Sequence, residues 1–384
     1  MSLSVSFMLM STDIAAQNTA IKQIEWTTAA ELQNENGGAS LGFAGPINAV
    51  LNDVFIVAGG ANFPDKMPWE GGAKYYSKEF HVLQKSRGHF QWNKNGKLEL
   101  PEAIAYCGNT VTKRGLVYAG GENESGLYRK AYLVNWDTTE NKASFEKLAD
   151  LPSAVTNVSL THIDNIVYAV GGDENTTSTK AFLSLDLDSK SPQWIRLPDL
   201  PIALANAVVV TQQLQGNTEI YVIGGRSKNL SGISELRNTV LIYSPINKTW
   251  KAGAAISDGD QTTNYSAGAG IAIGDNEILL LGGDNGETFH KIETYISQIS
   301  KSASTQEKEK LTVEKNALSI NHKGFYRGML IYNTETNKWI KMGELPFLTP
   351  VTTSARIWDG KIVLSNGEIK PGLRTPKVML GSIK

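Results

Sequence analysis

The feature that most constrains the fold is a repeated motif, an apolar run that ends in a pair of glycines. A sixth copy, at 361–367, has Asn366 in place of the first glycine, and asparagine tolerates the left-handed backbone better than most residues. Except for the last interval, the copies recur about every 50–60 residues, which predicts a repeat architecture. The copies are "VFIVAGG" (54–60), "LVYAGG" (116–121), "IVYAVGG" (166–172), "IYVIGG" (220–225), "EILLLGG" (277–283) and "KIVLSNG" (361–367).

Each glycine pair is followed by a second strand and then by an aromatic strand, often with Leu-Pro, as in "SPQWIRLPDLP" (191–201) and "NKWIKMGELP" (337–346). Several short strands per repeat with turn residues between them are typical of propeller blades, and the pattern resembles the kelch repeat. The segment 21–32 is a tryptophan strand without a preceding glycine pair, and the last repeat lacks a tryptophan strand. We therefore predict an all-β, six-bladed kelch-type β-propeller whose last blade is closed by the N-terminal strand. A two-sheet sandwich is the alternative.

The domain organisation follows from this repeat. Residues 21–384 form a single predicted propeller, and the longer last interval contains "ISQISKSASTQEKEKLTVEKNALSI" (296–320), which is charged and free of glycine. This composition predicts a helical insertion in the fifth blade, either a lid over one face or a solvated excursion.

Residues 1–20 are expected to be a signal peptide or a disordered tail. They contain a short apolar run and "DIAAQ", although Lys22 is the first basic residue. We expect an exported, periplasmic protein, with a cytoplasmic location as the alternative. No other apolar run reaches the ~18 residues that a spanning helix requires, so no membrane insertion is expected.

Composition argues against several classes of function. The net charge of −1 provides no field that attracts nucleic acid. Cys107 is the only cysteine and is expected in the core, and the five histidines have no metal-ligand spacing. We find no P-loop, dinucleotide fingerprint or nucleophile elbow. We therefore expect neither a metal nor another cofactor. The oligomeric state is not predicted.

The residue after each glycine pair is the first candidate for chemistry, because a propeller brings equivalent positions together around one channel mouth. Four carboxylates and one guanidinium would surround a polar pocket there, where carboxylates raise one another's pKa and an arginine binds a substrate carboxylate. For the two aspartates, capping of turns is the alternative. The six residues are Ala61, Glu122, Asp173, Arg226, Asp284 and Glu368.

The strongest candidates lie in "NGEIKPGLRT" (366–375). Pro371 and Gly372 exclude a regular helix, so Glu368 and Arg374 are predicted on one stiff loop, projecting into the pocket. A surface ion pair between them is the alternative. The loop "GGANFPDKMPWEGGAKYY" (59–76) would provide an apolar wall for a sugar ring, or would pack between blades.

The motif "NGEIKPGLRT", supported by the 59–76 loop, resembles the N-acetylneuraminate epimerase (sialic acid mutarotase) family of kelch-type propellers. In better-known members the motif lies in mid-chain, so its position here indicates a circularly permuted member. The resemblance implies an isomerase that exchanges the α and β anomers of N-acetylneuraminate through the open-chain sugar. It implies Glu368 as the proton acceptor and Arg374 as the active-site arginine.

Further substrate-binding candidates rest only on blade position or on nearness to a predicted loop; they are Glu122, Asn123, Arg226 and Arg327. The partner implied is a small sugar acid. A non-catalytic kelch propeller that binds a protein or glycan partner is the alternative function, and another sugar enzyme is a third.

Overall fold

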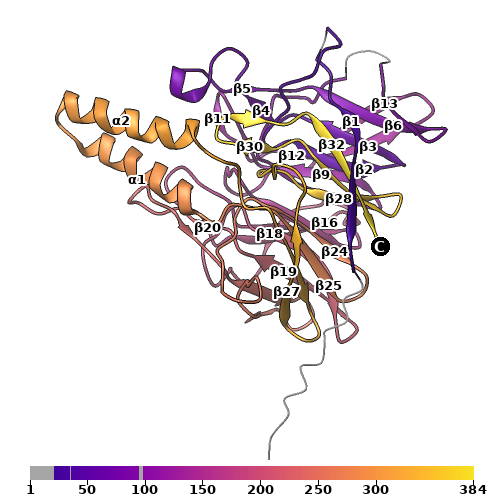
Figure 1. The fold of residues 1–384 in the computed structure, drawn as a ribbon. Coiled ribbons are helices and arrows are strands. Elements are labelled where there is room, and N and C mark those ends of the chain that lie inside the picture. Colours follow the sequence, from indigo (N-terminus) through magenta and orange to yellow (C-terminus); the bar gives the residue numbers. More distant parts are fainter. Residues whose placement is uncertain (1–20, 35, 95–97) are drawn as a thin grey trace, which may run out of the picture.

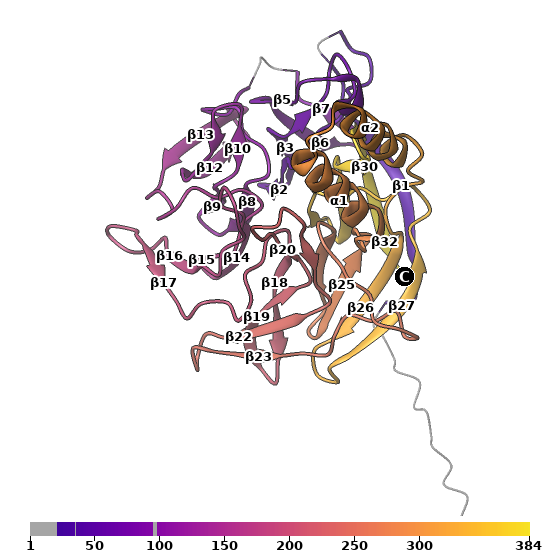
Figure 2. The same cartoon turned by 90° about the vertical axis from the view of Figure 1, so that its left-hand side faces the viewer.

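The computed structural model describes residues 21–34, 36–94 and 98–384 and confirms a six-bladed β-propeller. Figure 2 looks along the propeller axis and shows the sheets arranged around it, with inner strands such as β2, β8 and β14 nearest the centre. Each blade is a four-stranded antiparallel sheet, as the short strands and turn residues of each repeat predict.

The strands of each blade follow in order from the inside outward. They are β2 (Ile47–Leu51), β3 (Val54–Ala58), β6 (Phe80–Ser86) and β7 (His89–Trp92) in blade 1; β8 (Gly108–Thr112), β9 (Gly115–Ala119), β12 (Ala131–Asp137) and β13 (Lys142–Lys147) in blade 2; β14 (Ser159–Ile163), β15 (Ile166–Val170), β16 (Phe182–Asp186) and β17 (Trp194–Arg196) in blade 3; β18 (Val208–Leu214), β19 (Asn217–Ile223), β22 (Val240–Ser244) and β23 (Thr249–Ala252) in blade 4; β24 (Ala269–Ile273), β25 (Glu277–Leu281), β26 (Gly328–Asn333) and β27 (Lys338–Glu344) in blade 5; and β28 (Ala355–Trp358), β29 (Lys361–Ser365), β32 (Lys377–Ile383) and β1 (Ile24–Glu31) in blade 6.

The ring closes as predicted. The N-terminal strand β1 pairs antiparallel with the C-terminal strand β32, with Ile24 opposite Ile383 and Glu31 opposite Lys377. Figure 1 shows the two strands side by side, although they come from opposite ends of the sequence. Because of this closure, blade 6 has four strands, like each of its neighbours, and the propeller has no blade with an incomplete sheet.

The hydrophobic core lies between blades rather than in one central mass. Each cluster of buried side chains joins two adjacent sheets; Phe55 and Val57 of blade 1, for example, pack with Trp358 and Val363 of blade 6. Cys107 is buried in the cluster between blades 1 and 2, as expected, and burial raises the pKa of its thiol to about 12.

Tryptophans on outer strands link the blades further. Trp92 of β7 donates its indole N–H to the Glu31 carbonyl of β1 over 2.8 Å, and Trp339 of β27 donates to the Ala254 carbonyl over 3.0 Å. The aromatic strand of the repeat therefore has a structural role in joining neighbouring blades.

A closed ring of backbone hydrogen bonds surrounds the mouth of the central channel. In each blade one residue just before the innermost strand has a positive φ, between 53° and 62°. The N–H of each donates to the carbonyl oxygen of its neighbour over 2.7–3.1 Å, until the circle is complete. The six residues are Gly45, Tyr106, Asn157, Asn206, Ala267 and Thr352.

The glycine pairs lie next to this ring in the left-handed region of the backbone, for example Gly120 and Gly121 with φ values of 69° and 102°. Asn366 occupies the same conformation with a φ of 58°, as the sequence predicts. Its side-chain oxygen accepts a hydrogen bond from the Phe43 N–H over 3.0 Å, so the asparagine adds a contact that glycine cannot make.

The predicted insertion is present in blade 5 as two helices, α1 (Glu287–Lys301) and α2 (Thr305–Ile320). It begins at Glu287, earlier than the predicted residue 296, because α1 starts directly after the turn that follows the fifth glycine pair. Figures 1 and 2 show both helices on the face that carries β30.

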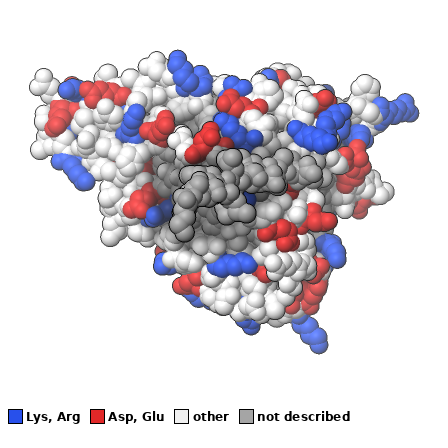
Figure 3. Space-filling view, turned by 60° about the horizontal axis from the view of Figure 1, so that its bottom comes forward, with Lys and Arg blue, Asp and Glu red and all other residues white. Residues whose placement is uncertain are grey.

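Among the described residues, no helix is long and apolar enough to cross a membrane. On the face drawn in Figure 3, basic and acidic side chains are interspersed rather than gathered by sign. The predicted signal peptide or tail at 1–20 lies outside the described residues.

Candidate active site

The six residues after the glycine pairs lie at the same end of the propeller, as predicted. Each forms an antiparallel bridge with the residue immediately before a member of the channel ring, for example Glu122 with Ala105 and Glu368 with Val351. In four blades the position also starts a short hairpin; these hairpins are β4 (Ala61–Asn62) with β5 (Tyr75–Tyr76), β10 (Glu122–Asn123) with β11 (Gly126–Leu127), β20 (Arg226–Ser227) with β21 (Glu235–Leu236), and β30 (Glu368–Lys370) with β31 (Leu373–Arg374).

Glu368 and Arg374 face one another across the last hairpin. They are register partners of β30 and β31, and Arg374 Nη1 lies 3.6 Å from Glu368 Oε1. The Gly372 N–H donates to the same carboxylate oxygen over 2.6 Å, and Gly372 has a φ of 79°. The Pro-Gly turn therefore orients the carboxylate, while the Glu368 side chain remains 20% exposed.

Arg374 is not part of a surface ion pair, because the residue is only 6% exposed. Its guanidinium lies over the Phe63 ring, 4.8 Å from the centroid. Nε and Nη1 are buried, and neither has a hydrogen-bond acceptor among the described residues. Buried donors without partners are unfavourable, so the arrangement suits an anionic ligand.

The 59–76 loop supports this hairpin. A Cβ on Gly372 would lie 2.9 Å from Pro68 Cδ and 3.3 Å from Trp69 Cζ3, so the loop packs tightly against the turn. Pro68 and Trp69 belong to the 3₁₀ helix η1 (Pro68–Glu70). Asn316 of α2 donates to the Trp69 carbonyl over 3.4 Å, which connects the insertion to the same loop.

A second polar cluster lies on the other side of this loop, around Glu122. One oxygen of its carboxylate accepts hydrogen bonds from Lys74 over 3.2 Å and from the Tyr76 hydroxyl over 2.8 Å. Burial and the hydrogen bond to Glu122 raise the pKa of Tyr76 to about 12. Burial alone would lower the pKa of Lys74, but Tyr106, Glu122 and Tyr76 outweigh it and the pKa is raised.

Tyr106 connects the two clusters, and it is not among the candidates that the sequence predicts. The Lys74 ammonium lies 5.0 Å from the centre of its ring. Burial raises the pKa of its hydroxyl, Lys74 and Arg374 act to lower it, and Glu368 and Glu122 act to raise it. The charges of both clusters therefore act on this phenol.

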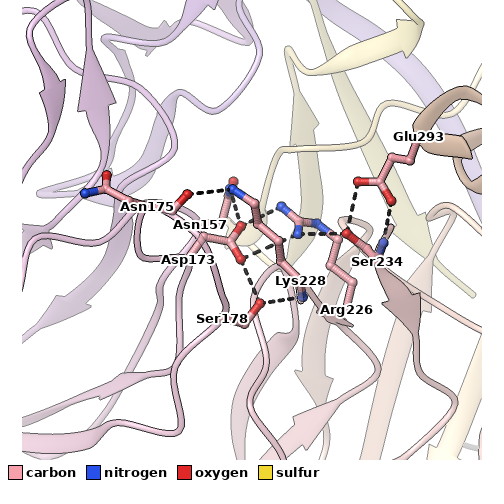
Figure 4. Close-up of polar contacts among 8 residues, drawn as sticks. All are labelled: Asn157, Asp173, Asn175, Ser178, Arg226, Lys228, Ser234 and Glu293. Atoms are coloured by element: carbon pink, nitrogen blue, oxygen red, sulfur yellow. Dashed lines mark hydrogen bonds and ion pairs between the residues drawn. The ribbon is translucent and has the colours of Figure 1, made fainter. Parts of the chain in front are cut away.

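Arg226 binds Asp173 instead of remaining free for substrate. Its Nη2 lies 2.5 Å from Asp173 Oδ2, and the two side chains are 13% and 3% exposed. Ser178 donates to the same carboxylate over 2.7 Å. Figure 4 shows how this network continues through Ser234 to Glu293 of α1. The network fixes the insertion to blades 3 and 4.

The remaining candidates have structural contacts. Asn123 uses its amide to hold its own turn, donating to the Ala103 carbonyl over 3.0 Å and accepting from the Ser125 N–H over 2.8 Å. Arg327 is exposed and donates to the Leu345 carbonyl rather than to a carboxylate of the ring. Asp284 accepts from the Gly286 N–H over 2.7 Å, and burial raises its pKa.

Fold and site together define a six-bladed β-propeller with carboxylates, cations and phenols gathered at one channel mouth. Residues 148–384 match the family model described as N-acetylneuraminate epimerase, and the chain belongs to that family.

Relatives with the name N-acetylneuraminate epimerase include proteins of Yersinia enterocolitica, at 28% identity over 242 residues (62% of this chain and 58% of the relative), and of Salmonella typhimurium, at 30% over 233 residues (59% and 56%). The Brucella melitensis protein is 26% identical over 252 residues (65% and 62%). The chain thus spans less than two thirds of the length of these relatives.

Proposed function

We propose that this protein is an isomerase that interconverts the α and β anomers of N-acetylneuraminate, with Glu368 and Arg374 as its catalytic pair. Membership of the N-acetylneuraminate epimerase family supports the reaction class and the sugar. The observation that carries the proposal is a buried arginine with unpartnered N–H groups, 3.6 Å from a glutamate that a backbone N–H orients.

Arg374 would bind the carboxylate of the sugar acid. Arginine and carboxylate match geometrically, and two parallel N–H to oxygen bonds are strong when both groups are charged. Phe63 covers the guanidinium and limits its freedom, so the cation is positioned before the ligand arrives. Binding would also satisfy the donors that lack a partner in the described structure.

Glu368 would act as the general base. Its Oε1 accepts from Gly372, and the partly exposed carboxylate can still reach a ligand at the channel mouth. It would take the proton from the anomeric hydroxyl while an acid protonates the ring oxygen. The bond between the anomeric carbon and the ring oxygen then breaks. Rotation of the carbonyl group and closure on its other face give the second anomer.

The test follows anomer conversion of freshly released N-acetylneuraminate by proton NMR, with the methyl ester of the same sugar as a matched substrate. We expect acceleration of the acid and a rate at least about 100-fold lower for the ester, because the ester removes the charge that Arg374 binds. No acceleration of either sugar by folded protein would contradict the proposal and favour a non-catalytic propeller. Equal acceleration would keep the reaction but remove Arg374 from carboxylate binding.

A further inference from the structure

Tyr106 differs from its counterparts in the ring of hydrogen bonds at the channel mouth. The other five positions have small or medium-sized residues, which are Gly45, Asn157, Asn206, Ala267 and Thr352. All six share a positive φ, so the ring explains the backbone conformation of Tyr106 but does not require an aromatic side chain. A bulky residue at a φ of 57° is uncommon, and such residues concentrate at functional sites.

The neighbouring blade leaves space for this side chain. A Cβ on Gly45 would lie 2.4 Å from Tyr106 Cδ1, so the ring packs directly over that glycine. Tyr106 also lines the cavity of the central channel. Its aromatic ring therefore extends from blade 2, which contains Glu122, over Gly45 of blade 1, and the Gly45 N–H in turn bonds Thr352 of blade 6, the blade that contains Glu368.

The charges around the phenol come from both halves of the site. Lys74 lies over its ring and is bound to Glu122, and the charges of Glu368 and Arg374 also act on the pKa of its hydroxyl. Within the part of the chain that the structure describes, no residue accepts a hydrogen bond from its hydroxyl. The Tyr76 hydroxyl, by contrast, already donates to Glu122.

We propose that Tyr106 is the catalytic acid of the proposed mutarotation, donating its proton to the ring oxygen as Glu368 accepts the proton of the anomeric hydroxyl. This inference rests on the function proposed above. In the opening step the bond between the anomeric carbon and the ring oxygen breaks, a carbonyl forms, and Tyr106 becomes a phenolate. On closure the phenolate takes the proton of the attacking hydroxyl, and Glu368 returns its proton to the carbonyl oxygen. Both groups regain their starting state.

The surrounding charges favour simultaneous transfer. While Glu368 is ionised it acts to raise the pKa of Tyr106, whereas Lys74 and Arg374 act to lower it. When Glu368 accepts a proton its negative charge disappears, and the two cations remain beside the forming phenolate. Protonation of Glu368 therefore makes the Tyr106 hydroxyl more acidic.

The test compares the wild type with Tyr106→Phe, which removes the hydroxyl but retains the ring over Gly45. We expect kcat for anomer conversion to fall about 10²–10⁴-fold, with KM changed by no more than about threefold, because a positioned acid contributes mainly in the transition state. Tyr243→Phe is the matched control, since Tyr243 lies on β22 in the core between blades 3 and 4 and should retain the wild-type rate. Placing 3-fluorotyrosine at position 106 should retain activity, because a more acidic hydroxyl is still present.

The outcomes separate this inference from the function on which it rests. An active wild type with an equally active Tyr106→Phe variant would overturn the acid role alone. A raised KM with unchanged kcat would also overturn it, because the hydroxyl would then only bind substrate. Loss of activity in the fluorotyrosine protein would indicate a packing role and overturn the acid role as well. An inactive wild type would overturn the proposed function and this inference together.

Discussion

Replacing Arg374 with methionine should separate stability from function. The guanidinium is almost fully buried, has two nitrogen atoms without a hydrogen-bond acceptor among the described residues, and lies 3.6 Å from Glu368. Methionine has a similar length and can pack on Phe63, but it has no charge. We expect the free energy of unfolding to change by no more than about 2 kcal/mol, while kcat/KM falls by about 10²–10⁴.

The magnitudes come from opposing terms. At 3.6 Å and an effective dielectric constant of about 20, the attraction between Glu368 and Arg374 is about 5 kcal/mol before desolvation. Burial of the guanidinium costs several kcal/mol, and each unpartnered donor costs about 1–3 kcal/mol, so the net effect on folding is small. Two charge-assisted hydrogen bonds to a substrate carboxylate are worth about 3–6 kcal/mol together, which gives the expected loss of kcat/KM.

Denaturant unfolding and NMR anomer conversion on the same preparations would measure both quantities. Arg129→Met is the matched control, because Arg129 is 57% exposed and pairs with Asp150 at the surface. The control should change stability by less than about 1 kcal/mol and leave activity intact. The reasoning would be refuted if Arg374→Met lowered the free energy of unfolding by more than about 4 kcal/mol, or if it retained full activity.

Three further predictions concern the ring and its surroundings. Gly45→Ala should displace Tyr106, because the new Cβ would lie 2.4 Å from its ring; we expect about 1–3 kcal/mol of destabilisation by urea unfolding and a clearly lower rate, and a wild-type rate would contradict the role of Tyr106. Asp173→Asn should leave the Arg226 cation uncompensated and reduce the free energy of unfolding by about 3–5 kcal/mol while kcat stays within tenfold; a larger fall in kcat would place this pair in the active site. Burial lowers the pKa of His162 in the folded state below its usual 6.5, so the unfolded state binds more protons as the pH falls through about 6.5; stability should fall with pH in that region, and His162→Gln should reduce that slope.

The architecture could be predicted from the sequence because it depends on local, repeated requirements. The glycine pairs and Asn366 mark positions with a positive φ, and few residue types tolerate that conformation. The tryptophan strand at the N-terminus lacked a glycine pair, and the last repeat lacked a tryptophan strand, so closure of one blade from both ends followed. The pairing of β1 with β32 confirms this.

The site was less predictable because blade position does not determine which partner a side chain finds. Arg226 and Asp173 follow equivalent glycine pairs in successive blades, and in the structure they neutralise one another. Nothing in the local sequence of Arg327 indicates that it would bind the Leu345 carbonyl. Such contacts depend on the distance between blades, which a linear pattern does not contain.

Tyr106 shows what comparison between repeats could have revealed. Aligning the ring residue two or three positions before each innermost strand gives small or medium-sized residues in five blades and tyrosine in one. Its neighbour Cys107 is a core residue, as predicted, which gives no indication that Tyr106 lies at the channel mouth. The informative feature is thus a departure from the repeat and not the repeat itself.

The most direct test of the central claim compares Glu368→Gln with Glu25→Gln in the NMR assay of N-acetylneuraminate anomer conversion. Both variants remove one carboxylate charge, but Glu25 is an exposed residue of the outer strand β1, 57% exposed and paired with Lys384. The account predicts that the wild type and Glu25→Gln accelerate conversion equally and that Glu368→Gln loses about 10²–10⁴-fold in rate. Full activity of a folded Glu368→Gln protein would contradict the claim that this glutamate is the base.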